Sequence, residues 1–224
     1  MWYDLFIDFL NGLFRQNKKG IKMAKKIYTI GYTTFGIEDF IKELKIVGIT
    51  CIIDVRTTPR SAYYKDFDAD ILEERLRKEG ILYRNYAYEF GARQEDKSLY
   101  PNGYLDFELF SKTENFRQGI KRLNSGIKQN QTFALMCAEK DPYNCHRCIM
   151  VSRFLKEYDF EILHIVGHNQ VVSQEEIEKR LVNEYYPNRN QFSLFAEDNL
   201  SDEECLLCAY RKRNKDIGFK IEEE

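Results

Sequence analysis

Short apolar runs alternate along this chain with segments whose apolar residues recur at helical spacing, and this alternation limits the possible folds most strongly. The expected strands are residues 27–30, 51–55, 81–83, 133–137 and 160–166. The expected helices are residues 37–47, 71–76, 115–127, 146–157 and 173–185. Strands that alternate with helices form a parallel sheet covered by right-handed crossovers. We therefore expect a three-layer α/β fold, with a mostly parallel sheet of about five strands and helices on both faces.

The expected domain does not use the whole chain of 224 residues. We assign residues 26–186 to the α/β domain, residues 1–25 to an N-terminal extension and residues 187–224 to a C-terminal tail. The apolar residues of 1–22 have helical spacing and could form an amphipathic helix. Alternatively, these residues lie upstream of the native start, because Met23 begins a more ordinary N-terminus just before the first strand.

Composition excludes several classes of protein. Lys and Arg total 34 against 36 Asp and Glu, so a nucleic-acid site would have to come from local basic patches. No apolar run reaches the roughly 18 residues of a membrane span. The six cysteines occur in a long chain without a signal peptide, which favours reduced thiols and a cytoplasmic location.

In a parallel α/β sheet, ligands bind beyond the carboxyl ends of the strands, so we look for polar and aromatic residues there. The candidates for substrate binding that follow the first three strands are Thr33, Thr34, Asp54, Arg56, Arg60, Tyr63, Tyr86 and Tyr88. The turn that contains Thr33 and Thr34 could hold an anion, although simple capping of the following helix explains these two residues equally well. Interleaved cations and rings are typical of phosphate contact with base stacking. The alternative explanations are that the residues after the second strand form a solvated loop, and that the rings after the third strand pack locally against the sheet edge.

The segment after the fourth strand has the densest set of reactive side chains. The candidate catalytic residues are Cys137, Glu139, Cys145, His146 and Arg147. A thiol at a helix start beside an imidazole and a guanidinium should have a lowered pKa, which applies here to Cys145. Glu139 could act as an acid or a base.

The chain resembles the DUF488 family of bacterial and archaeal proteins over about residues 26–168. The resemblance rests on four short segments, residues 29–33, 54–60, 136–139 and 145–147, together with His164 and Ile165. The family name means that no activity is established, so the resemblance implies a fold and a site rather than a reaction. Cys148 is not part of the family pattern.

A more distant likeness is to the rhodanese-type sulfurtransferases, which implies that Cys137 carries a persulfide. It rests on Ile53-Asp54-Val55-Arg56 and on Cys137 at the end of a strand. The rhodanese cysteine loop is short and rich in Gly and Ser. Here the loop runs through Glu139, Lys140 and Asp141, so it lacks the usual cradle of backbone amides.

Two motifs lie in or reach into the tail. Gln191, Leu194 and Phe195 belong to a pentapeptide that resembles the bacterial sliding-clamp binding motif, although its apolar residues could instead pack back on the domain. Two C-x-x-C pairs make a formal zinc set, namely Cys145, Cys148, Cys205 and Cys208. The pairs lie farther apart than in compact zinc modules, so we expect no cofactor and keep a bridging zinc or iron–sulfur site as an alternative.

These observations leave three functional hypotheses. The first is an enzyme that uses a Cys/Glu/His/Arg site on a nucleic acid or nucleotide-like anion, placed in DNA repair or replication if the clamp-like motif acts. The second is a rhodanese-like sulfurtransferase with Cys137 as persulfide carrier. The third is a non-catalytic, DNA-associated adaptor tethered through Gln191–Phe195.

Overall fold

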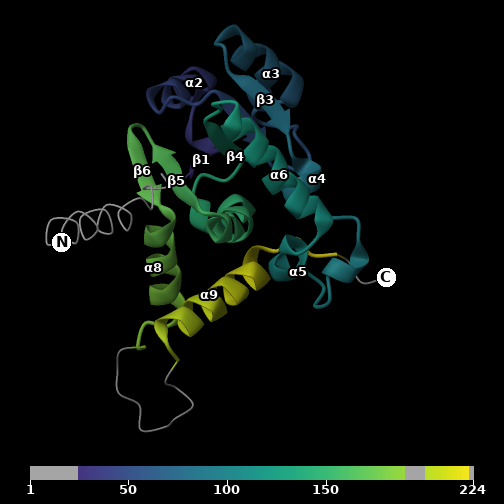
Figure 1. Ribbon diagram of the computed structural model, residues 1–224, viewed down its shortest axis with the longest axis vertical. Helices are drawn as coiled ribbons and strands as arrows, with labels where there is room; N and C mark the ends of the chain where they lie inside the picture. Colours follow the sequence, from purple (N-terminus) through teal and green to yellow (C-terminus); the bar gives the residue numbers. More distant parts are fainter. Residues whose placement is uncertain (1–24, 190–199, 222–224) are drawn as a thin grey trace, which may run out of the picture.

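A computed structural model describes residues 25–189 and 200–221, which fold around one six-stranded sheet (Figure 1). The strands lie in the order β3-β2-β4-β1-β5-β6. Their bounds are β1 Lys25–Gly31, β2 Cys51–Asp54, β3 Leu82–Asn85, β4 Phe133–Cys137, β5 Phe160–Gly167 and β6 Gln170–Ser173. The first five strands are parallel and β6 runs antiparallel to β5. The expected α/β class and mostly parallel sheet are confirmed, with one strand more than expected.

The additional strand, β6, follows β5 through a tight turn. Asn169 lies in the turn with a φ of 56°, in the left-handed region that Asn tolerates better than most residues. Its backbone N–H donates to the Glu43 carboxylate over 3.1 Å. Only Val171 and Val172 mark this strand in the sequence, and so short an apolar run does not distinguish a strand from the start of the following helix.

One face of the sheet is covered by the helices α2 (Ile37–Ile46) and α3 (Ala69–Lys78). Phe40 and Leu44 of α2 and Leu72 of α3 are fully buried against strand residues such as Ile52 and Met136. The helical spacing of these apolar residues predicts amphipathic helices, and in the structure the apolar stripe of each helix faces the sheet.

The other face of the sheet carries more helices, whose bounds are α4 Ala87–Phe90, α5 Phe107–Ser111, α6 Glu114–Lys128, a π-helical segment Arg147–Ser152, α7 Arg153–Leu155, α8 Gln174–Tyr185 and α9 Asp202–Ile217. Short 3₁₀ turns occupy Tyr32–Thr34, Lys65–Phe67, Lys97–Leu99, Pro142–Asn144 and Lys156–Tyr158. Phe116 and Leu123 of α6 are fully buried in the core of this face with Leu135 of β4. Strand residues alternate between the two cores, as a sheet buried on both faces requires.

Helix α9 lies in the segment that the sequence suggested to be a polar tail. It packs against α8, and the two helices meet in the lower half of Figure 1. Ser201 caps its first turn and forms a reciprocal capping box with Glu204. Cys205 and Tyr210 are buried on its inner side, so Cys205 is not an exposed thiol.

The carboxyl ends of the central strands meet at one rim of the sheet. Gly31 at the end of β1 pairs in register with Cys137 at the end of β4, and Asp54 at the end of β2 pairs with Met136. The loops after these strands therefore begin side by side. Among the helices of the described ranges, none combines the length and the apolar character needed to cross a membrane.

Candidate functional site

A cavity of about 420 Å³ opens at this rim, and we call it the rim pocket. Its walls come from the turn after β1, the loop after β2, the segment after α4, the loop after β4 and the C-terminal segment. The charged or reactive side chains that line it are Arg56, Arg60, Arg93, Cys137, Glu139 and His146. The fold therefore gathers residues that lie as much as 90 positions apart in the sequence.

The two cysteine sulfurs share one imidazole. Cys137 Sγ lies 3.7 Å from His146 Nδ1, and Cys145 Sγ lies 4.0 Å from the same nitrogen. His146 Nε2 lies 3.1 Å from the carbonyl oxygen of Val55. Since a carbonyl oxygen only accepts, Nε2 carries a hydrogen, and Nδ1 is left to face the sulfurs. Glu139 Oε2 lies 2.9 Å from Cys145 Sγ and completes the cluster.

The two thiols have opposite pKa shifts. Burial and the contact with Cys145 raise the pKa of Cys137 well above its usual value. Burial would also raise the pKa of Cys145, but the Cys137 thiol and the positive charges of Arg147 and His146 outweigh burial and lower it. Desolvation of its carboxylate, together with the neighbouring Cys145, raises the pKa of Glu139, although the residue as a whole is exposed. These opposite shifts favour Cys145 over Cys137 as the thiol that loses its proton, and the shift of Glu139 favours its acid form.

Arg147 holds the loop that carries this cluster, and its side chain is completely buried. Its Nη1 donates to the Glu139 carbonyl over 2.7 Å, and its Nε donates to Thr29 Oγ1 over 3.3 Å. Its charge is therefore fixed beside the two sulfurs, while its hydrogen bonds shape the backbone between Cys137 and Cys145.

A buried hydrogen-bond chain continues from Thr29 toward the C-terminal helices. Thr29 Oγ1 lies 2.8 Å from His164 Nδ1, and His164 Nε2 lies 2.8 Å from Gln174 Oε1. Gln174 Nε2 in turn donates to Tyr210 OH over 2.8 Å. Burial, together with the charge of Arg147, lowers the pKa of His164 to about 4. The ring is therefore neutral near pH 7, with Nε2 as donor and Nδ1 as acceptor.

Arg56 is held rigidly at the edge of the rim pocket. Its Nε donates to Asp54 Oδ1 over 2.9 Å and its Nη2 donates to Asp54 Oδ2 over 2.6 Å. Tyr83 OH donates to the same carboxylate over 2.6 Å. Arg56 is 6% exposed, and its Nη1 has no hydrogen-bond partner among the described residues. Buried donors are nearly always partnered, so this nitrogen is an exception, and it belongs to a side chain that lines the rim pocket.

The family model of DUF488, a domain of unknown function, matches residues 36–154. The chain belongs to the DUF488 family. No curated protein matches the chain. The DUF488 match contains Arg56, Cys137 and Cys145, but it ends before His164 and before α9.

The remaining predicted substrate-binding residues occupy different positions. Arg60 lines the rim pocket, and Asp54 lies behind it as the partner of Arg56. Thr33 Oγ1 donates to the Ala138 carbonyl over 2.7 Å and so ties the first turn to the thiol loop. The side chain of Thr34 lies outside the described part of the structure.

The three tyrosines suggested for stacking do not line the rim pocket. Tyr86 is buried beneath the guanidinium of Arg122, whose carbon lies 3.9 Å from the ring centroid. Tyr63 and Tyr88 are 92% and 70% exposed. Tyr88 instead borders a neighbouring cavity of about 660 Å³. The aromatic residues that line the rim pocket are instead Tyr32 and Phe219.

The sequence analysis missed one wall of the rim pocket, which Ile217 and Phe219 form beyond the DUF488 match. The backbone N–H of Leu105 donates to the Phe219 carbonyl over 2.9 Å and holds this segment in place. The Arg93 guanidinium carbon lies 4.4 Å from the Phe219 ring centroid. The capping box Ser201-x-x-Glu204 was the available signal that an ordered helix leads into this segment.

Cys137, Glu139, Cys145 and His146 could also hold a metal ion, because their donor atoms all lie within 4.8 Å of one another. Sulfur and imidazole ligands of this kind suit zinc. This is the one such group within residues 25–189 and 200–221, so the two C-x-x-C pairs do not come together there. Cys148 Sγ instead lies 3.7 Å from His164 Nε2. The clamp-like motif of residues 191–195 lies outside the described residues.

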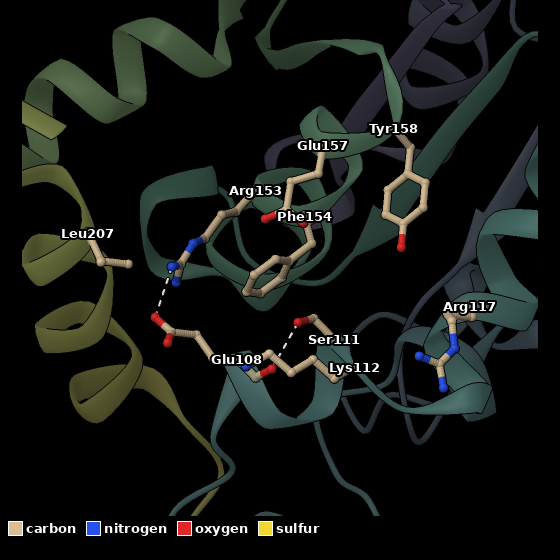
Figure 2. A pocket seen from close by; sticks show the side chains of 9 residues that line it. All are labelled: Glu108, Ser111, Lys112, Arg117, Arg153, Phe154, Glu157, Tyr158 and Leu207. Atoms are coloured by element: carbon tan, nitrogen blue, oxygen red, sulfur yellow. Dashed lines mark hydrogen bonds and ion pairs between the residues drawn. The ribbon is translucent and has the colours of Figure 1, made fainter. Parts of the chain in front are cut away.

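Another cavity, of about 330 Å³, lies between α5, α7 and α9 and contains no thiol (Figure 2). Arg153 Nη2 donates to Glu108 Oε1 across it over 2.9 Å, as the dashed line in Figure 2 shows. Arg211 donates to the same carboxylate over 3.0 Å. The charges of Arg153 and Glu108 are thus already satisfied within the protein.

Proposed function

We propose that this DUF488 protein is an enzyme that uses the Cys137–Cys145 pair on an anionic, phosphate-bearing substrate of the nucleotide or nucleic-acid class. One observation carries the proposal: the rim pocket combines the Cys137 thiol with a buried, unpartnered nitrogen of Arg56. A cysteine sulfur and an arginine that share one cavity favour covalent chemistry on an anion over a purely structural role.

The anion side of the pocket is built from three arginines. Arg56, Arg60 and Arg93 line the same cavity, and the buried Nη1 of Arg56 has no hydrogen-bond partner among the described residues. An oxygen of a bound phosphate would satisfy Nη1, and an arginine fork matches phosphate geometry well. Asp54 holds the other side of the Arg56 guanidinium, so little side-chain freedom is lost when the ligand binds.

The chemical side of the pocket assigns a role to each member of the cluster. Cys137 is the sulfur that lines the cavity, and the neighbouring Cys145 thiolate can take its proton as the attack begins. A bond then forms between Cys137 Sγ and an electrophilic carbon or phosphorus atom while the bond to the leaving group breaks. Glu139, shifted toward its acid form, can protonate the leaving group. His146 stabilises the negative charge of the sulfur pair.

Alkylation tests the proposal directly. Iodoacetate carries a negative charge and iodoacetamide does not, so the rim pocket should favour iodoacetate at Cys137 by about tenfold over a free thiol. Phosphate should slow the iodoacetate reaction by competition, and Arg60→Gln should reduce the preference. Mass mapping identifies the modified cysteine, and Lys78→Gln on α3 is the charge-matched control.

Two outcomes would reject the proposal. The first is a Cys137 that reacts with both reagents at the same relative rates as a free thiol. The second is an unchanged iodoacetate rate in the presence of phosphate. Cys148→Ser should leave the modification of Cys137 intact, because Cys148 does not line the pocket.

Sulfur transfer is a second candidate, and the position of Cys137 at the cavity favours it. Thiosulfate would transfer its outer sulfur to Cys137 and release sulfite, which leaves a persulfide on the protein. Arg147 donates to the loop carbonyls of Glu139 and Lys140, so His146 and Arg147 rather than backbone amides would stabilise the persulfide charge. A Cys137 peptide heavier by one sulfur after thiosulfate treatment supports this route, and an unmodified peptide rejects it.

A further inference from the structure

The rim pocket has two chemically different walls. One wall is charged and contains Arg56 and Arg60, and the other is apolar and contains Ile217 and Phe219 of the C-terminal segment. Arg93 lies over the Phe219 ring at 4.4 Å, so cation and ring form a stacked pair at the cavity. A phosphate alone would use the first wall and leave the second without a partner.

The apolar wall is a fixed part of the fold. Asn214 of α9 donates to the Leu105 carbonyl over 2.8 Å and accepts from the Phe107 backbone N–H over 2.9 Å. Ile221 N–H donates to the Gly103 carbonyl over 3.1 Å, which holds the chain beyond Phe219. The ring is therefore positioned in advance, which favours stacking because little order has to be gained on binding.

We infer that the rim pocket takes a mononucleotide, with its phosphate on Arg56 and Arg60 and its base against Phe219 and Ile217. This inference rests on the proposed function and names the substrate class of the same site. A nucleotide joins an anion to a flat ring of low polarity, and that combination matches the two walls. Aromatic and arginine side chains are the groups on which bases stack.

The surroundings favour a single nucleotide over a strand. The cavity of about 420 Å³ lies within the roughly 300–1,000 Å³ typical of small-molecule sites. The neighbouring cavity, which shares Thr57 and Arg93 with the rim pocket, is one way out for a longer strand. Glu95 and Asp96 border that exit, and their carboxylates would repel a phosphodiester backbone.

Calorimetric titration of the full chain with three probes tests the inference: adenosine 5′-monophosphate, inorganic phosphate and adenosine. We expect the mononucleotide to bind more tightly than either fragment. Phe219→Ala should weaken mononucleotide binding by between about fivefold and a hundredfold, the range for loss of one base stack. Its phosphate affinity should stay unchanged. Phe219→Tyr should keep wild-type affinity, and Leu207→Ala, on α9 but outside the rim pocket, is the matched control.

The outcomes separate this inference from the proposed function. If phosphate binds but the mononucleotide gains nothing over it, the base-reading wall is rejected and the anion site stands. If phosphate does not bind the wild-type protein, the proposed function fails as well. A short oligonucleotide that binds more tightly than the mononucleotide also overturns the inference. Should Phe219→Ala fail to fold, Phe219→Leu removes the ring while keeping apolar volume, and it must show the same selective loss.

Discussion

Replacement of Asp54 by Asn should strongly destabilise the protein, because it removes the counter-charge of a buried arginine. Asp54 is 0% exposed and accepts from the side chain and the backbone N–H of Arg56 and from Tyr83 OH. Asn keeps the size of Asp but is neutral, so the Arg56 guanidinium stays buried without a partner of opposite charge. Breaking a buried ion pair in this way costs about 3–5 kcal/mol.

The same change can be expressed as a melting temperature. For a chain of this length, 1 kcal/mol corresponds to roughly 2–4 °C, so Asp54→Asn should lower the melting temperature by about 6–20 °C. The double variant Asp54→Asn with Arg56→Met removes the buried charge itself. It should therefore be more stable than Asp54→Asn alone, which independent sites would not show.

Urea unfolding of the wild type, both single variants and the double variant measures this coupling. A loss below about 1 kcal/mol for Asp54→Asn would show that water or another group compensates Arg56, contrary to the buried geometry. Additive losses in the double variant would equally refute the reasoning, since they would mean that the two side chains do not act as a pair.

Three further predictions follow from the same structure. The folded-state pKa of His164 is about 4 against 6.5 for free His, so its contribution of about 3 kcal/mol is present above pH 6.5 and lost as the pH falls to 4. Urea unfolding at several pH values should show this loss, and a His164→Gln variant should show less of it. Gly31→Ala should slow Cys137 alkylation, because the new Cβ would overlap the Glu139 carbonyl oxygen, whereas Gly36→Ala meets no atom within 4 Å. Asn214→Ala should lower the free energy of unfolding by about 1–3 kcal/mol, because two buried backbone groups lose their partners. Wild-type stability of this variant in thermal unfolding would contradict the prediction.

The central strands and the thiol loop were predictable because their signals are local. β2 and β4 are mostly apolar and entirely buried, as strands buried on both faces require, and a charged residue follows the end of each strand by two positions. The lowered pKa of Cys145 was likewise expected from its immediate neighbours His146 and Arg147. In these cases the residues that determine the geometry lie within a few positions of the feature itself.

The apolar wall was not predictable in the same way, since it depends on contacts between distant parts of the chain. Phe219 reaches the rim pocket only because α9 packs across α8 and the following segment pairs beside Leu105. The buried stripe of α9 is narrow and contains Cys205, Tyr210 and Asn214, so it does not stand out as a hydrophobic helix. Tyr86 illustrates the converse, because a ring in a promising loop turns inward and packs against Phe90.

The structure divides the rim pocket into a part that the DUF488 match contains and a part that it does not. The sulfur pair, His146 and the three arginines of the rim pocket lie within residues 36–154, whereas Phe219 lies beyond that range. Arg213 of α9 links the two parts, since it donates to the Tyr143 carbonyl over 3.1 Å and its guanidinium lies against the Tyr143 ring. If the proposed chemistry is correct, the matched segment sets the reactivity of the thiol. The C-terminal segment then determines which anion reaches it, so exchange of this segment should change substrate preference while Cys137 keeps its reactivity.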